Sequence, residues 1–318
     1  MKKADFNGIA EKYQISPIIA RLMRNRDVIG DEAIDFYLNG TVEDLYDGLL
    51  MKDMDRAVDI LKEKIEEGKK IRVIGDYDID GVCSTYILLQ AFERLGSDVD
   101  FEIPDRIKDG YGINESIIEQ AHADGVEVIL TCDNGISAFH QVELAKKYGM
   151  TVVITDHHEV PLDGEKEKIP PADAVIDPKQ ADCPYPFPEI CGAVVAYKLV
   201  QVLYARRGVP QMEWLDLLEF AAIATVGDVM KLQDENRILV KYGLKKMAQT
   251  KNLGLRRLAE KNNLDLGAIT AYHIGFVIGP CLNAGGRLKT AKEALALLRA
   301  QSEEEAERLA EELKELND

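Results

Sequence analysis

Three aspartates stand at alternate positions directly after a short apolar run. The segment reads Val73-Ile74-Gly75-Asp76-Tyr77-Asp78-Ile79-Asp80-Gly81, and the residues from Ile71 to Gly75 have the pattern of a strand. Carboxylates this close repel one another unless cations neutralise them or water solvates them. The pattern therefore indicates either a metal site at the end of a strand or a well-solvated turn.

The same spacing opens the calcium loop of an EF-hand, which has a glutamate at its twelfth position. Counted from Asp76, the twelfth residue is Ile87, and the segment before Asp76 has the pattern of a strand rather than a helix. Both features argue against an EF-hand. We therefore interpret the aspartates as residues at the carboxyl end of a strand.

Two further segments repeat this order of strand and then ligand-type residue. The run at 126–132 leads into Asp133-Asn134-Gly135, and the run at 151–155 leads into Asp156-His157-His158. Helical patterns separate the strands, and the sequence predicts helices at 84–95, 116–123 and 137–148 and a last strand at 174–178. This alternation predicts an α/β fold with a parallel sheet flanked by helices. In such sheets, sites form at the carboxyl ends of strands, where all three clusters are expected.

Helical patterns flank the predicted α/β core on both sides. Residues 1–68 are predicted to be a helical leader packed on the core, and 69–288 the main domain, with its α/β core at 70–178 and a helical part at 190–288. Within that helical part, helices are predicted at 193–206 and 214–226. A connecting helix is expected over 289–318, and its apolar stripe runs to the last residue without a capping Gly or Pro. We therefore expect the natural protein to continue beyond residue 318.

Composition narrows the function classes. With 46% apolar and 30% charged residues, the 318-residue chain is an ordinary globular protein. No apolar run reaches the length of a membrane span and no signal peptide precedes Phe6, so we expect a cytoplasmic protein with no membrane partner. Five cysteines without a Cys-x-x-Cys pair argue against a zinc ribbon or a disulfide framework. The net charge of −17 argues against broad electrostatic binding to nucleic acid, although bound cations reverse the sign inside an acidic pocket.

The residues at the predicted strand and helix ends supply a ligand set for two metal ions. The set comprises Asp78, Asp80, Asp133, His157 and Asp228. One or two imidazoles among carboxylates favour Mn²⁺, and Mg²⁺ also fits. Two such ions hold a phosphate, lower the pKa of a bound water and stabilise the leaving oxygen.

Two neighbours of His157 have supporting roles in this hypothesis. His158 would contact the phosphate or protonate the leaving group. Asp156 would orient the residues around it.

These motifs resemble those of the DHH phosphoesterase superfamily, whose defining motif stands here as Asp156-His157-His158. Within the superfamily, the chain is most similar to the RecJ family of single-strand-specific 5′→3′ exonucleases. The resemblance covers nearly the whole chain and includes residues 16–20, 53–68, 75–81, 132–136 and 227–229. The segment at 278–288 resembles a signature of RecJ that separates it from its superfamily relatives.

The resemblance implies roles for individual residues. It implies that Asp78, Asp80, Asp133, His157 and Asp228 hold two Mn²⁺ or Mg²⁺ ions, and that Asp76 assists at the site. It also implies that residues 103–112 contact DNA phosphates, with Arg106 and Arg287 binding phosphate oxygens. Tyr111 belongs to that DNA-contacting segment, and Asn283 would orient Arg287 or reach the substrate.

Three positions depart from the family pattern. Ile74 stands where some relatives have a His, which leaves the coordination of one metal open. Cys281 replaces a usual Arg and removes one expected positive charge, and Gly285 replaces a usual Ala. The family normally adds a DHHA1-type domain with a Gly-Gly-His motif, toward which the connecting helix is expected to lead.

The sequence thus predicts a metal-dependent 5′→3′ exonuclease that hydrolyses single-stranded DNA by a two-metal mechanism. From the resemblance alone, single-strand binding protein and a helicase are expected partners. One alternative is a superfamily phosphodiesterase that acts on short oligonucleotides, cyclic dinucleotides or pyrophosphate. A second alternative is a non-catalytic scaffold, which the intact ligand set argues against.

Overall fold

The structure is a computed structural model that describes residues 4–105, 112–288 and 290–318, without the side chains of residues 287 and 288. Its centre is a five-stranded parallel sheet with the order β2-β1-β3-β4-β7. The strands are β1 (Ile71–Ile74), β2 (Val99–Glu102), β3 (Val128–Cys132), β4 (Thr151–Thr155) and β7 (Ala174–Ile176). The predicted α/β fold with a parallel sheet flanked by helices is confirmed.

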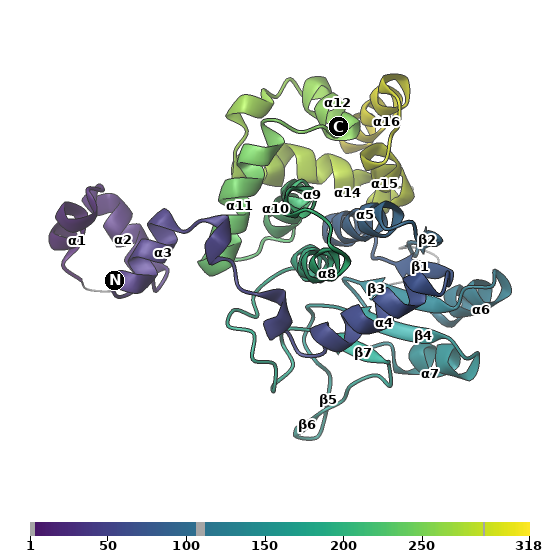
Figure 1. Cartoon of the computed structure of the whole chain (residues 1–318). Coiled ribbons are helices and arrows are strands. Elements are labelled where there is room, and N and C mark those ends of the chain that lie inside the picture. Colours follow the sequence, from purple (N-terminus) through teal and green to yellow (C-terminus); the bar gives the residue numbers. More distant parts are fainter. Residues whose placement is uncertain (1–3, 106–111, 289) are drawn as a thin grey trace.

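Helices cover both faces of this sheet (Figure 1). Strand residues Val73, Leu130 and Val153 belong to the larger apolar core, which they share with three helices: α4 (Met54–Glu66), α5 (Ile79–Arg94) and α8 (Gly192–Arg207). Ile129 and Ile154 belong to a second core on the other face, formed with α6 (Glu115–Ala123) and α7 (Phe139–Lys147). Successive strand residues point to opposite faces, so each continuous apolar run of the sequence contributes to both cores.

The strand order reverses between β1 and β3. The chain passes from β1 outward to β2 on one side, and from β3 outward to β4 and β7 on the other. The loops that follow β1 and β3 therefore diverge at the carboxyl edge and leave a crevice, which is where ligands bind in open α/β sheets.

The remaining helices form a second layer beside the sheet, coloured green to yellow in Figure 1. In chain order they are α9 (Gln211–Leu215), α10 (Leu218–Gly227), α11 (Asp234–Met247), α12 (Leu253–Lys261), η3 (Leu266–Ala268), α13 (Ala271–His273), the π-helix η4 (Ile274–Ile278), α14 (Gly279–Leu288), α15 (Lys292–Leu298) and α16 (Glu303–Asn317). Among the described residues, no helix is long and apolar enough to cross a membrane.

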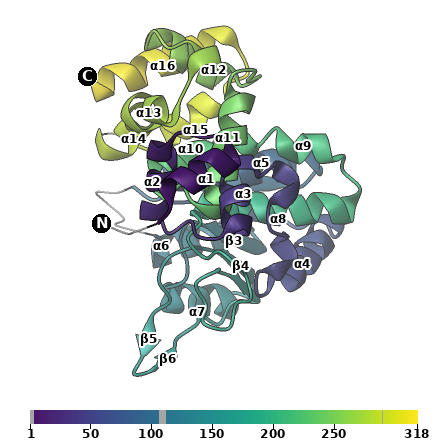
Figure 2. The ribbon, with the colours of Figure 1, turned by 90° about the vertical axis from the view of Figure 1, so that its left-hand side faces the viewer.

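The first helices stand apart from this body. These are α1 (Phe6–Tyr13), α2 (Pro17–Asn25) and α3 (Asp31–Asn39), and the segment with η1 (Val42–Asp44) and η2 (Gly48–Leu50) joins them to the body. They project to the left in Figure 1 and toward the viewer in Figure 2. Of the predicted helical leader at 1–68, α4 therefore lies on the sheet, whereas α1 and α2 project away from it.

Two predicted helices are each divided in the structure. The pattern at 214–226 is interrupted at residues 216–217, between α9 and α10. The pattern at 290–318 is interrupted at residues 299–302, between α15 and α16. There Asn252 Nδ2 donates to Leu298 O at 2.7 Å, and the Ser302 hydroxyl caps α16 by accepting from Glu305 N. The prediction of a single connecting helix at 289–318 is therefore wrong. Two separate helices form instead, and side chains make hydrogen bonds to the backbone groups at the ends between them.

A short hairpin, β5 (Leu162–Asp163) and β6 (Lys166–Glu167), follows β4 and extends from the lower end of the body in both views (Figures 1 and 2). This hairpin was not predicted, because two-residue strands leave no periodic pattern in a sequence.

Candidate metal centre

The turn between β1 and α5 presents three carboxylates. Asp78 caps α5, and its Oδ1 accepts hydrogen bonds from the backbone N–H groups of Asp80 and Gly81, both at 3.0 Å. The helix therefore begins at Ile79 rather than at 84 as predicted. A Cβ built on Gly81 would lie only 2.4 Å from the backbone oxygen of Asp76, so the tight turn requires glycine here.

Asp80 lies against the amino end of α8. Its Oδ2 accepts a hydrogen bond from Gly192 N at 2.7 Å, and its Oδ1 accepts one from Ala193 N at 2.8 Å. Backbone N–H groups in the first turn of a helix have no partner within the helix and attract anions. Gly192 also leaves room for Asp133, because a Cβ there would lie 2.7 Å from Asp133 Cβ. This role of Gly192 was not predicted, because the only signal in the sequence was a glycine at the start of a helical pattern.

The loop after β3 brings Asp133 beside this turn. Asp133 has a left-handed backbone with φ 61°, a conformation that aspartate tolerates better than most residues. The next side chain holds the loop in place, since Asn134 Nδ2 donates to Ile74 O at 3.1 Å and to Cys132 O at 2.9 Å. Asn134 therefore fixes the end of β3 to the end of β1, a role that the sequence analysis did not assign.

Asp156 organises the loop after β4 through hydrogen bonds from three backbone N–H groups. Its Oδ1 accepts hydrogen bonds from His157 N at 2.7 Å and His158 N at 3.2 Å, and lies 2.7 Å from Nδ1 of the His158 ring. Its Oδ2 accepts a hydrogen bond from Ile136 N at 2.9 Å. This is the geometry that the predicted orienting role of Asp156 requires.

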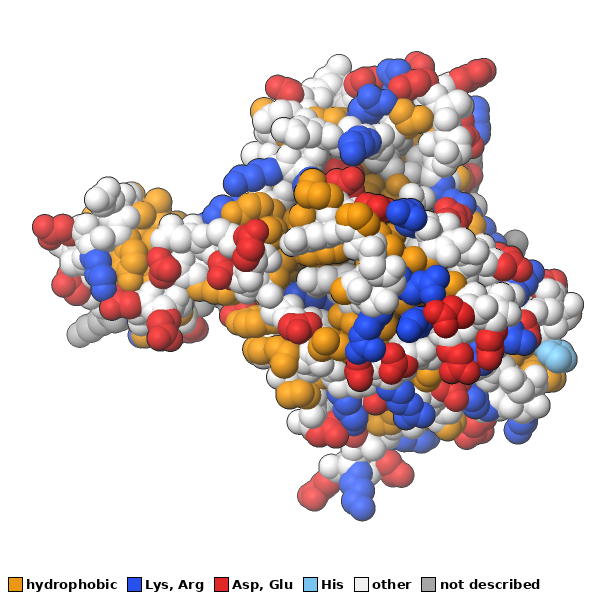
Figure 3. Space-filling view, viewed as in Figure 1, with side chains coloured by type: hydrophobic (Ala, Val, Ile, Leu, Met, Phe, Trp, Pro, Cys, Tyr) orange, Lys and Arg blue, Asp and Glu red, His pale blue; other side chains and the backbone are white. Residues whose placement is uncertain are grey.

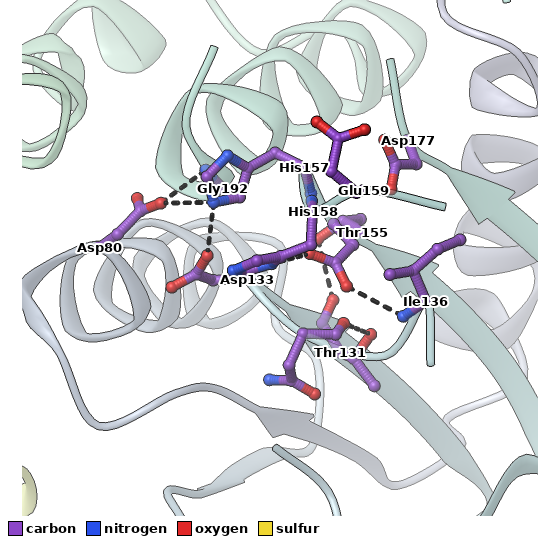
Figure 4. Close-up of polar contacts among 12 residues, drawn as sticks. Asp80, Thr131, Asp133, Ile136, Thr155, His157, His158, Glu159, Asp177 and Gly192 are labelled. Carbon is purple, nitrogen blue, oxygen red and sulfur yellow. Dashed lines mark hydrogen bonds and ion pairs between the residues drawn. The ribbon is translucent and has the colours of Figure 1, made fainter. Parts of the chain in front are cut away.

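The ring of His157 is where four segments meet: its own loop after β4, the β1–α5 turn, the loop after β3 and the end of α10. Its Nε2 lies 3.0 Å from Asp133 Oδ1 and 3.4 Å from Asp80 Oδ2 (Figure 4). It also lies 4.0 Å from Asp228 Oδ2. Asp228 comes from the carboxyl end of α10. Three sets of side chains have donor atoms that all lie within 4.8 Å of one another: Asp76, Asp78 and Asp133; Asp80, His157 and Asp228; and Asp133, His157 and His158. The structure thus brings the five predicted metal ligands together in one cluster, with Asp76 and His158 beside them.

Burial and mutual repulsion perturb the carboxylates of this cluster. Burial, with repulsion from Asp78, raises the pKa of Asp76 to about 7, and burial with repulsion from Asp80 raises the pKa of Asp228 to about 7. The same causes raise the pKa of Asp78 and, more strongly, that of Asp133. A divalent cation reverses this effect because it favours the ionised form of each carboxylate. The donor set therefore fits divalent metal ions.

The two histidines differ in protonation. Burial lowers the pKa of His157 and favours the neutral ring, which is the form that binds metals. Its Nδ1 has no hydrogen-bond partner among the described residues. Burial also lowers the pKa of His158, but the hydrogen bond to Asp156 and the negative charges of Asp156, Asp80 and Asp228 together outweigh burial and raise it overall. His157 is thus suited to hold a metal ion and His158 to carry a proton.

A pocket of about 330 Å³ opens beside the cluster. Its lining comes from the β1–α5 turn, the end of α10 and α14, and comprises Tyr77, Asp78, Ile79, Gly227, Asp228, Asn283 and Gly286. Of the predicted DNA-binding residues, the structure places Asn283 in this pocket. Arg106 and Tyr111 lie outside the described residues, as does the side chain of Arg287.

One buried acid at this edge was not predicted to belong to the site. Asp177 follows β7, and its Oδ1 accepts a hydrogen bond from Lys179 N at 2.8 Å. Burial raises the pKa of Asp177 to about 7, with repulsion from Asp156 as a further cause. The available signal was an acid near the end of the strand predicted at 174–178, but that prediction included Asp177 in the strand, which ends at Ile176.

Comparison with known proteins gives consistent matches. Residues 70–225 match the model of the DHH family, N-terminal domain. The chain is 39% identical over 310 residues to the single-stranded-DNA-specific exonuclease RecJ of Bacillus subtilis, which covers 98% of this chain and 38% of that protein. It is 35% identical over 315 residues to the protein of the same name from Escherichia coli, covering 96% of this chain and 53% of that protein. The chain therefore spans about half or less of the length of these curated relatives.

Solved structures agree with these matches. A crystal structure of exonuclease RecJ bound to manganese is 35% identical and superposes with a TM-score of 0.76, covering 84% of this chain and 66% of that one. The Mn²⁺ complex of RecJ from Thermus thermophilus is 30% identical with a TM-score of 0.81, covering 98% of this chain and 43% of that one.

Proposed function

Because the chain belongs to the DHH family through the domain at residues 70–225, we propose that it hydrolyses phosphodiester bonds with the help of divalent metal ions. We propose further that it removes nucleotides from single-stranded DNA, the activity in the names of its relatives, and that it begins at the 5′ end. One observation carries the proposal: seven donor side chains converge in one cluster at the carboxyl edge of the sheet. Single-strand binding protein and a helicase as partners, and a cytoplasmic location, stay predictions from the sequence.

Two sets of donors would each hold one metal ion. Asp76, Asp78 and Asp133 form one set, and Asp80, His157 and Asp228 form the other. Carboxylates with one imidazole suit either Mn²⁺ or Mg²⁺, and solved RecJ structures contain these two metals. When bound, the ions would supply positive charge for the phosphate and acidify a water molecule for attack.

The histidine outside these two sets would serve the leaving group. The side chain of His158 is 43% exposed and therefore accessible to a substrate. Burial raises the pKa of Asp156, but the hydrogen bond and charge of His158, with the N–H groups of Ile136 and His157, together lower it overall. An ionised Asp156 would hold the His158 ring in position and keep it protonated, so that the ring can donate a proton to the leaving oxygen.

The substrate strand would enter through the pocket that Asn283 lines. The Oδ1 atom of Asn283 has no hydrogen-bond partner among the described residues. Nearby, a Cβ built on Gly286 would lie 2.3 Å from Tyr77 O, so this wall of the pocket is formed by backbone rather than by side chains. We propose that Asn283, together with Arg106, Tyr111 and Arg287, contacts the DNA.

The proposal is tested with the chain itself and the isosteric variant Asp133→Asn. Purified proteins are incubated with 5′-phosphorylated single-stranded DNA, in Mn²⁺, in Mg²⁺ and in chelator. We expect metal-dependent release of mononucleotides, reduced at least about 100-fold in the variant because a ligand is lost. Asp163→Asn, an exposed carboxylate on the β5–β6 hairpin, is the matched control. Undiminished digestion by Asp133→Asn would reject the proposed centre.

Two additional assays separate the alternatives. Turnover of a cyclic dinucleotide or pyrophosphate, with no release from DNA, would place the chain in another branch of the superfamily. Calorimetric titration of the unmodified chain and of Asp133→Asn with Mn²⁺ tests the scaffold alternative. If the chain is a scaffold that does not hold the ion, the two proteins should bind Mn²⁺ equally weakly.

A further inference from the structure

Three exposed apolar side chains lie on the two helical segments that lead to the candidate metal centre and its pocket. Val229 is 86% exposed, Tyr272 is 63% exposed and Phe276 is 70% exposed. Large apolar side chains that are exposed beside a polar pocket are informative, because exposed apolar patches often mark interaction sites. We call these three residues the apolar rim.

Val229 has a backbone conformation that would suit glycine better. It follows Asp228 at the carboxyl end of α10, where its N–H donates to Val226 O at 3.2 Å. Its φ is 57°, in the left-handed region, where a β-branched residue is strained and glycine is usual. The helix end makes no use of the side chain, which is almost fully exposed. A strained residue directly after a candidate ligand points to a function for that side chain.

Tyr272 and Phe276 form a stacked pair. Their ring centroids lie 4.8 Å apart, and the ring planes differ by 24°. The pair spans α13 and η4, and π-helical turns are rare and concentrated at functional sites. The same continuous helix leads through α14, so Phe276 precedes the pocket residue Asn283 by seven residues, about 10 Å along the axis.

The aromatic pair and Val229 lie on segments that pack together. A Cβ built on Gly275, next to Phe276, would lie 3.6 Å from Cγ1 of Val226 on α10. The helix that carries the aromatic pair therefore contacts the end of α10 that carries Asp228 and Val229. Figure 2 shows α13 and α14 together at the upper left of the body.

Electrostatic attraction is a weak source of DNA affinity for this chain. Its net charge is −17, and Figure 3 shows acidic and basic side chains intermixed on the face in view rather than one broad basic surface. Binding to an unpaired strand needs a contribution that does not depend on phosphate charge. Stacking of bases on aromatic side chains supplies such a contribution and tolerates any sequence.

We infer that the apolar rim is a stacking platform for the unpaired bases of the strand whose phosphate lies at the metal centre. This inference rests on the proposed function and adds to it the origin of the preference for single strands. Bases inside a duplex already stack on one another and are not available to the platform. The rim thus determines specificity, and the phosphate chemistry stays with the metal centre.

The test compares two oligonucleotides with equal numbers of phosphates, a thymidine 12-mer and an abasic 12-mer. Binding is measured by fluorescence anisotropy in Ca²⁺, with intact oligonucleotide verified on a gel. The chain is expected to bind the thymidine 12-mer roughly 5- to 150-fold more tightly, the range that stacking of one base supplies. The double variant Tyr272→Leu/Phe276→Leu keeps apolar side chains but loses the rings, so it should lose this preference without a change in salt dependence.

Tyr148→Leu is the matched control. Tyr148 also stacks, on His122 with centroids 4.2 Å apart, but it caps α7 at the opposite edge of the sheet. This variant should keep the preference for thymidine. Equal binding of both oligonucleotides by the unmodified chain, including no binding of either, would overturn the inference. A preference for thymidine that persists in the double variant would also overturn it. If that variant in addition dissociated an oligomer of the chain, the rim would instead be an interface between copies of the protein.

Val229→Gly gives a second, independent readout. Glycine relieves the left-handed strain, so the melting temperature should rise, whereas thymidine binding should weaken because the platform loses a side chain. A rise in stability with unchanged binding would exclude Val229 from the platform. Failure of the proposed hydrolysis is distinguishable, because it appears as absent Mn²⁺-dependent cleavage while the base preference in Ca²⁺ persists.

Discussion

Nε2 of His157 lies 3.0 Å from Oδ1 of Asp133, although 24 positions separate the two residues in the sequence. The contact follows from the register of the sheet, in which β3 and β4 pair in parallel with Cys132 opposite Thr155. The residues that follow each strand therefore emerge side by side at the same edge. The register of two buried strands thus sets the geometry of the candidate metal centre.

This pairing predicts opposite effects of Asp133→Asn with and without metal. Burial and neighbouring carboxylates raise the pKa of Asp133, so the metal-free protein is destabilised when that group ionises. At pH 8 in chelator, the variant should therefore melt at a higher temperature than the unmodified protein. In saturating Mn²⁺ the order should reverse, because the variant binds the ion less tightly and gains less stability from it. Equal gains from Mn²⁺, measured by calorimetry, would show that Asp133 is not a ligand.

The strands and the candidate ligands at their ends could be located from the sequence because their signals are local. β4 was predicted at its observed bounds, since a continuous β-branched run at Thr151–Thr155 ends abruptly at a polar motif. Because sites in parallel sheets form at the carboxyl ends of the strands, three separate motifs could then be assigned to one cluster.

The features that were missed depend on contacts between distant segments. The hydrogen bonds from the amino end of α8 to Asp80 join residues more than 100 positions apart. The break between α15 and α16 is held by Asn252, and an apolar stripe alone does not reveal it because the stripe continues across the break. The start of α5 was placed too late because Asp78 was interpreted as a ligand and not also as a helix cap.

The hydrogen bond between Asp156 and His158 predicts a shift in the pH profile of hydrolysis. If His158 donates a proton, activity is lost as pH rises through its pKa, which the bond to Asp156 raises. Asp156→Asn removes the charge that stabilises the imidazolium, so this loss should begin at a lower pH. Profiles of kcat between pH 6 and 10 in Mn²⁺ measure the effect. An unshifted limb in the variant, or an unaltered profile in His158→Ala, would argue against proton donation by His158.

Glu219 predicts a dependence of stability on pH that is independent of the metal centre. This side chain on α10 is buried, its Oε1 accepts a hydrogen bond from Thr250 at 2.7 Å, and burial raises its pKa to about 7. A carboxyl whose folded-state pKa is raised binds its proton more tightly when folded, so stability falls as pH rises from about 4.5 to about 7.

Glu219→Gln removes this penalty, and the variant should be the more stable protein at pH 8 but not at pH 4.5. A rise in pKa from 4.5 to about 7 corresponds to at most about 3 kcal/mol. Urea unfolding at the two pH values measures the difference, with the exposed Glu165→Gln as control. A constant difference across this range would mean that Glu219 is not protonated in the folded protein.

Lys198 and Glu235 form an ion pair that is fully buried, with Nζ 3.0 Å from Oε2. Lys198 also donates to Tyr46 O, and Glu235 accepts from the hydroxyl of Tyr185, so the pair joins α8 and α11 to two loops.

Lys198→Met leaves a buried carboxylate without its cation and should cost about 3–5 kcal/mol in urea unfolding. Lys198→Met/Glu235→Leu should recover part of this loss, because no unpaired charge remains. Arg206→Met, which removes two exposed ion pairs from the same helix, should cost less than about 1 kcal/mol. Equal costs for the two single variants would show that burial does not determine the contribution of the pair.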